Sequence, residues 1–183
     1  RLIVEYPEKI VFGLKAIMKA VGVERGIIAI EKNKPDAILA LKEAAKDEPN
    51  IQIATLKVKY PQGDEKRLIN AVLGRVVPSG GLPMDVGAIV SNASTTKAIA
   101  DAILEGKPLY ERITTITGKG VKEPRNLLVK IGTPIKNLIE QCGGFAENAP
   151  GKIICGGPMM GISQYSIDVP VIKGTNGVLI LTE

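Results

Sequence analysis

The sequence has no histidine and no tryptophan, and it has only two cysteines, Cys142 and Cys155. Without histidine the chain cannot form a Ser-His-Asp triad, a Cys-His nucleophile pair, a histidine-ligated zinc or iron site, or an imidazole acid-base catalyst. Two cysteines alone cannot ligate a structural zinc or an iron–sulfur cluster, which needs four thiolates. They are most simply free buried thiols in a reducing compartment. We therefore expect a bound cofactor or a partner to supply any reactivity.

Long hydrophobic runs are also missing. No apolar stretch approaches the roughly 18 residues of a membrane-spanning helix, and the first residues lack the apolar core of a signal peptide. The chain has 24 Lys and Arg against 19 Asp and Glu, a net charge of +5. This excess can attract a phosphate-bearing ligand or an anionic membrane surface, although a solvated surface with a few extra lysines is the simpler explanation, and it is too diffuse to indicate nucleic-acid binding. We expect a cytosolic chain and, because it opens on a strand-like run without an initiator methionine, a piece of a longer protein.

The 183 residues suffice for one domain of generous size or two small ones. Helical periodicity and capping signals predict helices at 7–21, about 36–46, 64–73 and about 95–104. Short apolar runs predict buried strands at 26–30, 51–58 and 86–90. Helices that alternate with strands imply right-handed crossovers and a parallel sheet. Residues 1–110 are therefore predicted to form an open α/β layered domain.

Beyond residue 108 the pattern changes. β-branched residues at 112–117, turn residues at 118–124 and apolar residues at 127–131 predict a β-hairpin. A helix is predicted at 133–141, and strands are predicted at 152–155 and 177–181. We interpret residues 111–168 as a small β-grasp-like module and residues 169–183 as a strand that returns to the first domain.

Three glycine-rich segments can bind phosphate through backbone N–H groups, namely 61–65, 78–83 and 156–161. None matches a dinucleotide fingerprint or a P-loop, and each alone is more simply a turn. The first lies between a predicted strand and a predicted helix, where open α/β sheets bind ligands. Its basic neighbours are Lys57, Lys59, Lys66 and Arg67. Glu65 can accept a hydrogen bond from a ribose hydroxyl, although a helix N-terminus also attracts carboxylates for dipole reasons alone.

A second candidate is the polar junction 91–96, which follows the predicted strand 86–90. Asn92 carries donor and acceptor groups that match the polar edge of a flavin or a base. Asn92, Ser94 and Thr95 are also candidate N-caps of the next helix, and capping, by Ser94 or Thr95 for example, is the simpler role for this segment. Met159 and Met160 stand among turn residues, and they are either buried under a neighbouring loop or placed to cover a flat ligand.

Five separate motifs follow one another along the chain, at 59–66, 74–83, 116–118, 142–145 and 156–161. Their order is that of a known family. Together they closely resemble the C subunit of the Rnf electron-transport complexes over essentially the whole chain. The layout is similar, more distantly, to the flavin-binding subunit of respiratory complex I and to the corrin reductase of propanediol-utilisation microcompartments. The fold class implied is α/β, with an incomplete open Rossmann-like layered domain followed by a small β-grasp (soluble-ligand-binding) module.

The resemblance implies a peripheral subunit on the cytoplasmic side of the cell membrane. Such a subunit takes hydride from NADH onto FMN and passes single electrons to 4Fe-4S clusters, with the other membrane subunits and, through the complex, ferredoxin as partners. The complex couples NAD and ferredoxin to an ion gradient, and nucleic acid is not among its partners. No catalytic residue and no metal ligand is expected within this chain.

The resemblance also implies cofactor-binding residues. Gly63, Asp64 and Glu65 match the Gly-Glu-Glu segment that lies beside flavin and nicotinamide in the complex I relative. Asn92 and Thr95 match the second Asn and the Thr of its Asn-Asn-Val-Glu-Thr flavin segment.

The sequence departs from the family in two ways. Ser91 and Ser94 replace an Asn and the Glu of the flavin segment, so the hydrogen-bonding set there is thinner. The family's glycine-rich FMN loop is expected upstream of residue 1, and its two motifs of four cysteines are expected downstream of residue 183. We therefore expect the isolated fragment to be inactive. A non-catalytic binding or assembly module, or a related flavin-dependent corrin reductase, is the alternative.

Overall fold

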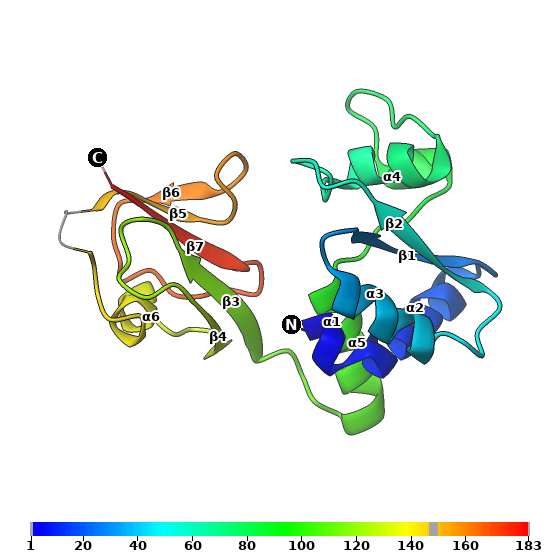
Figure 1. Cartoon of the computed structure of the whole chain (residues 1–183), viewed down its shortest axis with the longest axis horizontal. Helices are drawn as coiled ribbons and strands as arrows, with labels where there is room; N and C mark the ends of the chain where they lie inside the picture. Colours follow the sequence, from blue (N-terminus) through cyan, green and yellow to red (C-terminus); the bar gives the residue numbers. More distant parts are fainter. Residues whose placement is uncertain (1, 147–149, 183) are drawn as a thin grey trace. The chain divides into compact units, whose positions relative to one another are not determined.

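A computed structural model describes residues 2–146 and 150–182 of the chain (Figure 1). It divides into two compact units, Arg1–Pro108 and Leu109–Glu183. The division falls where the residue pattern changes in the sequence. Each unit has its own core and its own sheet.

Unit 1 contains most of the helices and a two-stranded parallel sheet. The helices of this unit are α1 Leu2–Glu5, α2 Pro7–Val21, α3 Pro35–Ala44, α4 Glu65–Leu73 and α5 Ala93–Glu105, with a 3-10 turn η1 at Pro83–Val86. The strands are β1 Gly26–Glu31 and β2 Ile51–Leu56, which pair in parallel from Gly26↔Ile51 to Glu31↔Leu56. The helices predicted from periodicity and the parallel pairing of the first two strands are confirmed.

Local signals in the sequence determine where α2 begins and ends. Pro7 occupies its first turn, where a missing N–H costs nothing. Gly22 ends the helix in the left-handed conformation, with φ of 76°, and its N–H donates to the carbonyl of Met18. Glycine suits this position because residues with a Cβ rarely adopt it.

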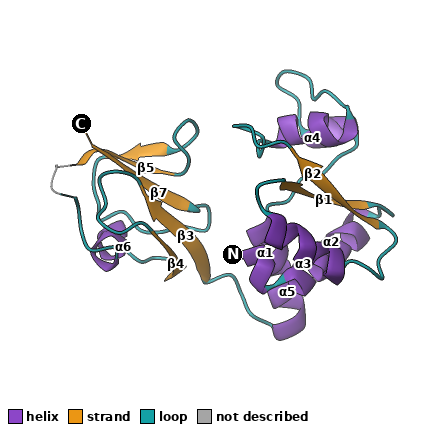
Figure 2. Ribbon diagram, in the orientation of Figure 1, coloured by secondary structure: helices purple, strands orange, loops and turns teal. Residues whose placement is uncertain are grey.

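The core of unit 1 lies between the sheet and the helices before and after β1. Ile10 of α2 and Leu41 of α3 are buried with Ile30 of β1, and Ile28 packs against the same cluster. Ile28 and Ile30 are two residues apart, so their side chains leave the strand on one face. Figure 2 shows α2 and α3 on one side of the two strands and α4 on the other.

Two local predictions for unit 1 are wrong. The strand-like run at the start of the chain forms the short helix α1. Residues 86–90 do not form a strand: Val86 ends η1, Gly87 adopts φ of 64°, and Ile89 is 57% exposed. A strand needs a neighbour for its backbone groups, and none of the described strands pairs with this segment.

Unit 2 is a five-stranded mixed sheet covered on one face by a helix. Its elements are β3 Glu111–Thr117, β4 Arg125–Lys130, α6 Ile135–Gln141, β5 Pro150–Cys155, β6 Ile162–Gln164 and β7 Gly177–Thr182. The strand order is β4-β3-β7-β5-β6. β3 and β4 pair antiparallel from Glu111↔Lys130, so the predicted hairpin is confirmed.

The final strand does not return to the first unit, as we expected of residues 169–183. β7 lies in the middle of the second sheet, where it pairs in parallel with β3 and antiparallel with β5. Val178 and Ile180 of β7 are fully buried in the core of unit 2. Pairing on both edges and this burial together hold β7 in unit 2.

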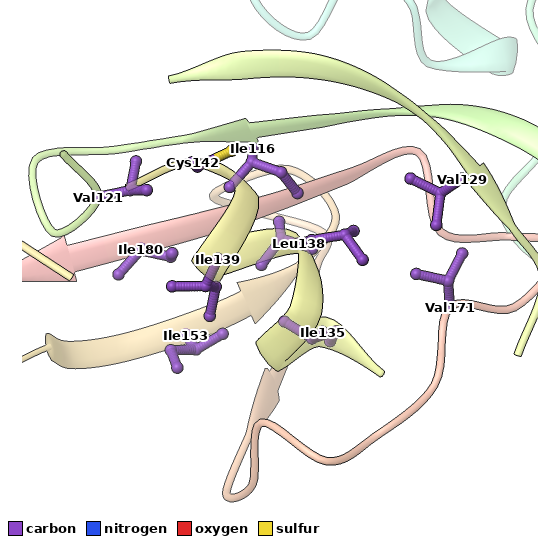
Figure 3. Close-up of a cluster of buried hydrophobic side chains, with 11 residues drawn as sticks. Ile116, Val121, Val129, Ile135, Leu138, Ile139, Cys142, Ile153, Val171 and Ile180 are labelled. Atoms are coloured by element: carbon purple, nitrogen blue, oxygen red, sulfur yellow. The ribbon is translucent and has the colours of Figure 1, made fainter. Parts of the chain in front are cut away.

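The core of unit 2 forms where α6 packs on the sheet. Ile135, Leu138 and Ile139 point from the helix toward Ile116, Ile153 and Ile180 of three strands (Figure 3). The names Rossmann-like and β-grasp remain predictions, and what the structure provides is a mixed helix and sheet architecture in each unit. Among the described residues, no helix is long and apolar enough to cross a membrane.

Candidate ligand site at the first turns of α4 and α5

The first candidate segment connects β2 to α4. After Leu56 the chain turns through a cis peptide bond between Tyr60 and Pro61. The Gln62 N–H donates to the carbonyl of Lys59, and the Asp64 N–H donates to that of Pro61. Two successive turns therefore carry the chain from the end of β2 to the start of α4.

Asp64 caps α4. Its backbone is extended, and its carboxylate accepts from the Arg67 N–H at 3.3 Å. Glu65 follows in the first turn, is exposed, and has no partner among the described residues. The fold therefore uses the carboxylate of Asp64 and leaves that of Glu65 available to a ligand.

Gly63 has no structural reason to be glycine. Its φ is not in the left-handed region, and a Cβ built on it meets no atom within 4 Å. By contrast, Gly74 at the other end of α4 adopts φ of 67°. Open space at an unstrained glycine is suited to the close approach of a ligand to the backbone.

Four basic side chains surround this segment. Lys57, Lys59 and Arg67 are exposed and Lys66 is half-buried. None of them joins an ion pair within the described parts of the chain. With four cations against two carboxylates, the start of α4 carries net positive charge, and the helix N-terminus adds a partial positive charge.

The second candidate segment is the start of α5. Asn92 caps the helix through its Oδ1 atom, which accepts from the Ser94 N–H at 2.9 Å. Capping uses only the oxygen of this amide, so the exposed Nδ2 group remains a donor. Thr95 is exposed in the first turn of the helix. Ser94, which is one of the predicted caps, instead supplies the N–H group that Asn92 caps.

Thr96 connects the first turn of α5 to the rest of unit 1. It is buried, and its hydroxyl lies 3.1 Å from both the Ser91 hydroxyl and the Asn92 carbonyl. A Cβ on Gly13 of α2 would lie only 2.1 Å from the Thr96 carbonyl oxygen. Glycine at 13 therefore permits the close packing of α2 against the start of α5. Sequence reasoning missed this residue, although a glycine inside a helical pattern was the available signal.

A buried carboxylate holds the same two helices together further along. Asp101 of α5 accepts from Lys9 of α2 at 2.7 Å and from Lys97 one turn before it. Burial acts to raise the pKa of Asp101, but the two lysine hydrogen bonds outweigh it and lower the pKa below its ordinary value. Both ammonium groups also face the ring of Tyr6, at 5.6 and 4.6 Å from its centroid. These contacts fix the helix that carries Asn92 and Thr95.

The other two glycine-rich segments are turns. The Gly81 N–H donates to the Pro78 carbonyl, and Gly80 between them adopts φ of 76°. The segment 156–161 connects β5 to β6, and Gly161 cannot carry a Cβ because it would lie 2.6 Å from the Gly157 carbonyl oxygen. Gly80 and Gly161 thus each have a structural reason to be glycine that involves no ligand.

The methionine and cysteine candidates lie outside both of these segments. Met159 and Met160 are each 73% exposed, so they are not buried under a neighbouring loop. Cys142 and Cys155 are free, and burial raises the pKa of both thiols. The described residues contain no group of three or more His, Cys, Asp and Glu placed to hold a metal ion.

The structure does not join the two candidate segments. Gly63, Asp64 and Glu65 are neighbours at the start of α4, and Asn92 and Thr95 lie at the start of α5. No hydrogen bond or ion pair connects the two sets within the described parts of the chain. A groove of about 750 Å³ lies in the same unit, and none of the five residues lines it.

Comparison with known proteins shows the class of protein. A family model described as the Nuo51 FMN-binding domain matches residues 1–101, and the SLBB domain model matches residues 113–163. The first match spans more than half of the chain, so the chain belongs to the Nuo51 FMN-binding domain family.

Curated relatives resemble the whole chain. It is 50% identical over 182 residues to the C subunit of the Na(+)-translocating ferredoxin:NAD(+) oxidoreductase complex of Acetobacterium woodii, covering 100% of this chain and 41% of the relative. It is 52% identical over 183 residues to the proton-translocating counterpart of Clostridium ljungdahlii, covering 100% of this chain and 40% of that protein. The predicted resemblance to the C subunit is confirmed, and the chain spans about two fifths of the length of these relatives.

A solved structure shares the fold. The NAD+-reducing [NiFe]-hydrogenase in its H2-reduced state superposes with a TM-score of 0.74 over 98% of this chain and 37% of that chain. At 18% identity this likeness is informative about the fold alone.

Proposed function

We propose that this chain is the central segment of a peripheral electron-transport subunit. The whole subunit oxidises NADH with FMN and passes electrons one at a time to 4Fe-4S clusters in an ion-translocating NAD:ferredoxin oxidoreductase complex. The observation that carries this proposal is the set of groups at the start of α4 that the fold does not use. These are the open backbone at Gly63, the carboxylate of Glu65 and the basic side chains around them, none of which pairs with another described residue.

Each of these groups suits a dinucleotide. Gly63 lets a planar or phosphorylated ligand approach the backbone, and Glu65 accepts a hydrogen bond from a ribose hydroxyl. Lys57 and Lys59 are exposed cations that attract the pyrophosphate. Asp64 has a structural part, because capping α4 holds Glu65 in place.

The start of α5 suits the polar edge of a flavin. The Nδ2 group of Asn92 donates and the hydroxyl of Thr95 donates or accepts. The contact between Gly13 and Thr96 and the ion pairs of Asp101 position both groups. FMN, when bound, supplies the step between two-electron and one-electron transfer. The cluster ligands belong to parts of the longer protein outside this chain.

The relatives' names favour ferredoxin over a corrin as the other electron partner of the complex, because the two relatives are named for ferredoxin and NAD(+). They do not indicate the ion. The sodium and proton proteins are 50% and 52% identical to this chain, nearly the same distance away. We therefore assign ion choice to other parts of the complex.

The test is Glu65→Gln in the full-length protein, with NADH titrated against an artificial acceptor. Glutamine keeps a neutral acceptor, so the change replaces a hydrogen bond to a charged group, which contributes about 1.5–3 kcal/mol, by a neutral one of about 0.5–1.5 kcal/mol. The apparent KM for NADH should therefore rise about five- to tenfold. Glu8→Gln is the matched control, because Glu8 is an exposed carboxylate in the first turn of α2. Both changes remove one dipole interaction of about 0.3–1 kcal/mol, so both should lower the Tm slightly. Equal effects of the two changes on NADH use would refute the proposed role.

A second candidate is a docking role for unit 2. Met159 and Met160 lie between β5 and β6, Ile162 begins β6 and Tyr165 follows it, and these four side chains are 73%, 73%, 72% and 99% exposed. Exposed apolar groups gathered on one hairpin are typical of a protein contact. Met159→Ser with Met160→Ser in the full-length protein should then reduce co-purification with the other subunits and leave NADH oxidation unchanged. The control is Leu128→Ser, since Leu128 is 67% exposed on the opposite edge strand. Normal assembly of the double variant would exclude this role.

A further inference from the structure

Unit 1 contains a half-open apolar groove that no described segment fills. Its volume is about 750 Å³. Helix α2 lines one wall with Leu14 and Ile17, and α4 lines another with Leu68 and Val72. A water molecule occupies about 30 Å³ in the liquid, so the groove holds about 25 of them. An apolar space of this size is not a hydration site for a few ordered waters, and a segment of chain or a ligand can fill it.

The groove runs along the unpaired edge of β1. Four consecutive residues of this strand, from Gly26 to Ala29, line it. Side chains alternate between the faces of a strand, so consecutive residues share a wall only where the edge itself faces the space. The Gly26 N–H donates to Asn50 and the Lys32 N–H to Leu56, at the two ends of the ladder with β2. Successive N–H groups of a strand point to alternate edges, so those of Ile27 and Ala29 point away from β2.

The segment that the sequence predicts as a strand, and that the structure does not form, lines the same groove. Residues 87–90 all contribute to its lining. Two segments of strand-like sequence thus face one groove. Neither has a strand partner on the side that faces the groove among the described strands.

We propose that the groove receives a further β-strand, parallel to β1, from the part of the longer protein that precedes Arg1. The curated relatives are long enough to contain such a strand, because this sequence covers only 41% and 40% of the length of the first two. A strand of ordinary length has about 5–6 residues, which matches the 6 residues of β1. The completed sheet has the order β2, β1, new strand, 86–90.

The topology gives both the edge and the direction. We take the crossover from β1 through α3 to β2 as right-handed, because nearly all such connections are. Ile10 of α2 packs in the same cluster as Leu41 of α3 and Ile30 of β1, so α2 and α3 cover one face of the sheet. Consider a strand that precedes α2 and is connected to β1 by α2, on this same face of the sheet. With a right-handed connection as well, the step from this strand to β1 runs in the same direction across the sheet as the step from β1 to β2. The new strand therefore lies on the side of β1 away from β2, which is the side of the groove.

The occupant also accounts for the isolated two-stranded sheet. Parallel strands are normally buried in larger sheets, and an isolated pair of strands has only marginal stability. With a strand in the groove, residues 86–90 gain a neighbour for their backbone groups. On this proposal, residues 86–90 form a strand only where that neighbour is present.

Hydrogen exchange tests the proposal without any mutation. The 183-residue chain is compared with versions extended separately at the N-terminus and at the C-terminus by the natural sequence. The N-terminal extension should slow exchange at Ile27, Ala29 and 86–90 by at least about tenfold and leave Gln52 unchanged. Protection that comes only from the C-terminal extension, or with rising concentration of the 183-residue chain, would overturn the assignment. No added protection in any version would overturn it as well.

A pair of proline variants gives an independent measurement. Ala29→Pro removes an N–H that points into the groove, so the 183-residue chain should tolerate it and the N-terminally extended protein should lose roughly 5–10 °C in Tm. Ile28→Pro removes an N–H directed at β2, so it should destabilise both. Equal effects of Ala29→Pro in the two proteins would count against the strand. These readouts involve no flavin or NADH, so failure of the proposed function leaves them unaffected.

Discussion

Replacing Gly13 by alanine tests whether α2 packs closely against the first turn of α5, which carries Asn92 and Thr95. A Cβ at this position lies 2.1 Å from the Thr96 carbonyl oxygen and 2.9 Å from both its carbonyl carbon and its Cγ2. The nearest atom is backbone of the first turn of α5, so it cannot rotate away as a side chain would. The helices must separate by about 1 Å to restore normal contact distances.

Two opposing effects determine the result. Alanine is favoured over glycine inside a helix by about 1 kcal/mol. Overpacking a well-packed contact costs about 1–3 kcal/mol or more. The short distance to backbone places this site at the upper end, so we expect Gly13→Ala to lower the free energy of unfolding by about 1–2 kcal/mol.

Urea unfolding followed by circular dichroism measures this difference. The matched control is Ala20→Gly, because Ala20 is exposed on the same helix and reports helix propensity without packing. It should cost about 0.5–1 kcal/mol. If Gly13→Ala instead stabilises the protein by about that amount, the close approach of α2 to Thr96 is wrong.

Two further changes test the other contacts that hold each unit together. Asp101→Asn should cost about 1–3 kcal/mol at pH 7, because Lys9 and Lys97 lose their buried acceptor. The pKa of Asp101 is lowered in the folded state, so its stabilisation is present above the ordinary carboxyl pKa of about 3.9 and is lost as pH falls through the lower folded value. The difference in Tm between the two proteins should therefore be constant above about pH 5 and shrink in acid, and a constant difference down to pH 2 would contradict this origin. Gly118→Ala should destabilise unit 2 more than Gly132→Ala does, because both have positive φ but only at Gly118 would a Cβ meet backbone, 2.0 Å from a carbonyl oxygen of β7. Equal losses in urea unfolding would mean that backbone strain alone accounts for both.

Local sequence patterns were sufficient for most elements of the fold. The helix from Pro7 to Val21 and the hairpin formed by β3 and β4 were predicted because their signals lie within a few residues of one another. The parallel pairing of β1 and β2 followed from the helix between them. The resemblance to the C subunit of the Rnf complexes rested on motif order and is confirmed by the relatives.

For the candidate site, the sequence indicated which segments to consider and could not say what each side chain does. Asp64 and Glu65 are adjacent carboxylates, yet one caps α4 and the other has no partner among the described residues. Asn92 was predicted both as a candidate N-cap and as a partner for the polar edge of a flavin, and the structure confirms the cap through its oxygen. Gly13 was overlooked because its reason for being glycine is a residue 83 positions away in the chain, Thr96. The assignment of these residues to FMN and NADH remains a prediction.

The sequence by itself determined the elements whose cause is local: where helices begin and end, which runs favour strands, and which chemistry is excluded by the lack of histidine and the two cysteines. Tertiary structure decided what depends on distant neighbours. β7 belongs to the second sheet because β3 and β5 pair with both of its edges. Residues 86–90 have strand-like sequence and no strand, because the backbone groups of a strand are satisfied only by a neighbour. A sequence pattern records the preference of a segment, and the presence of that neighbour is a property of the folded chain.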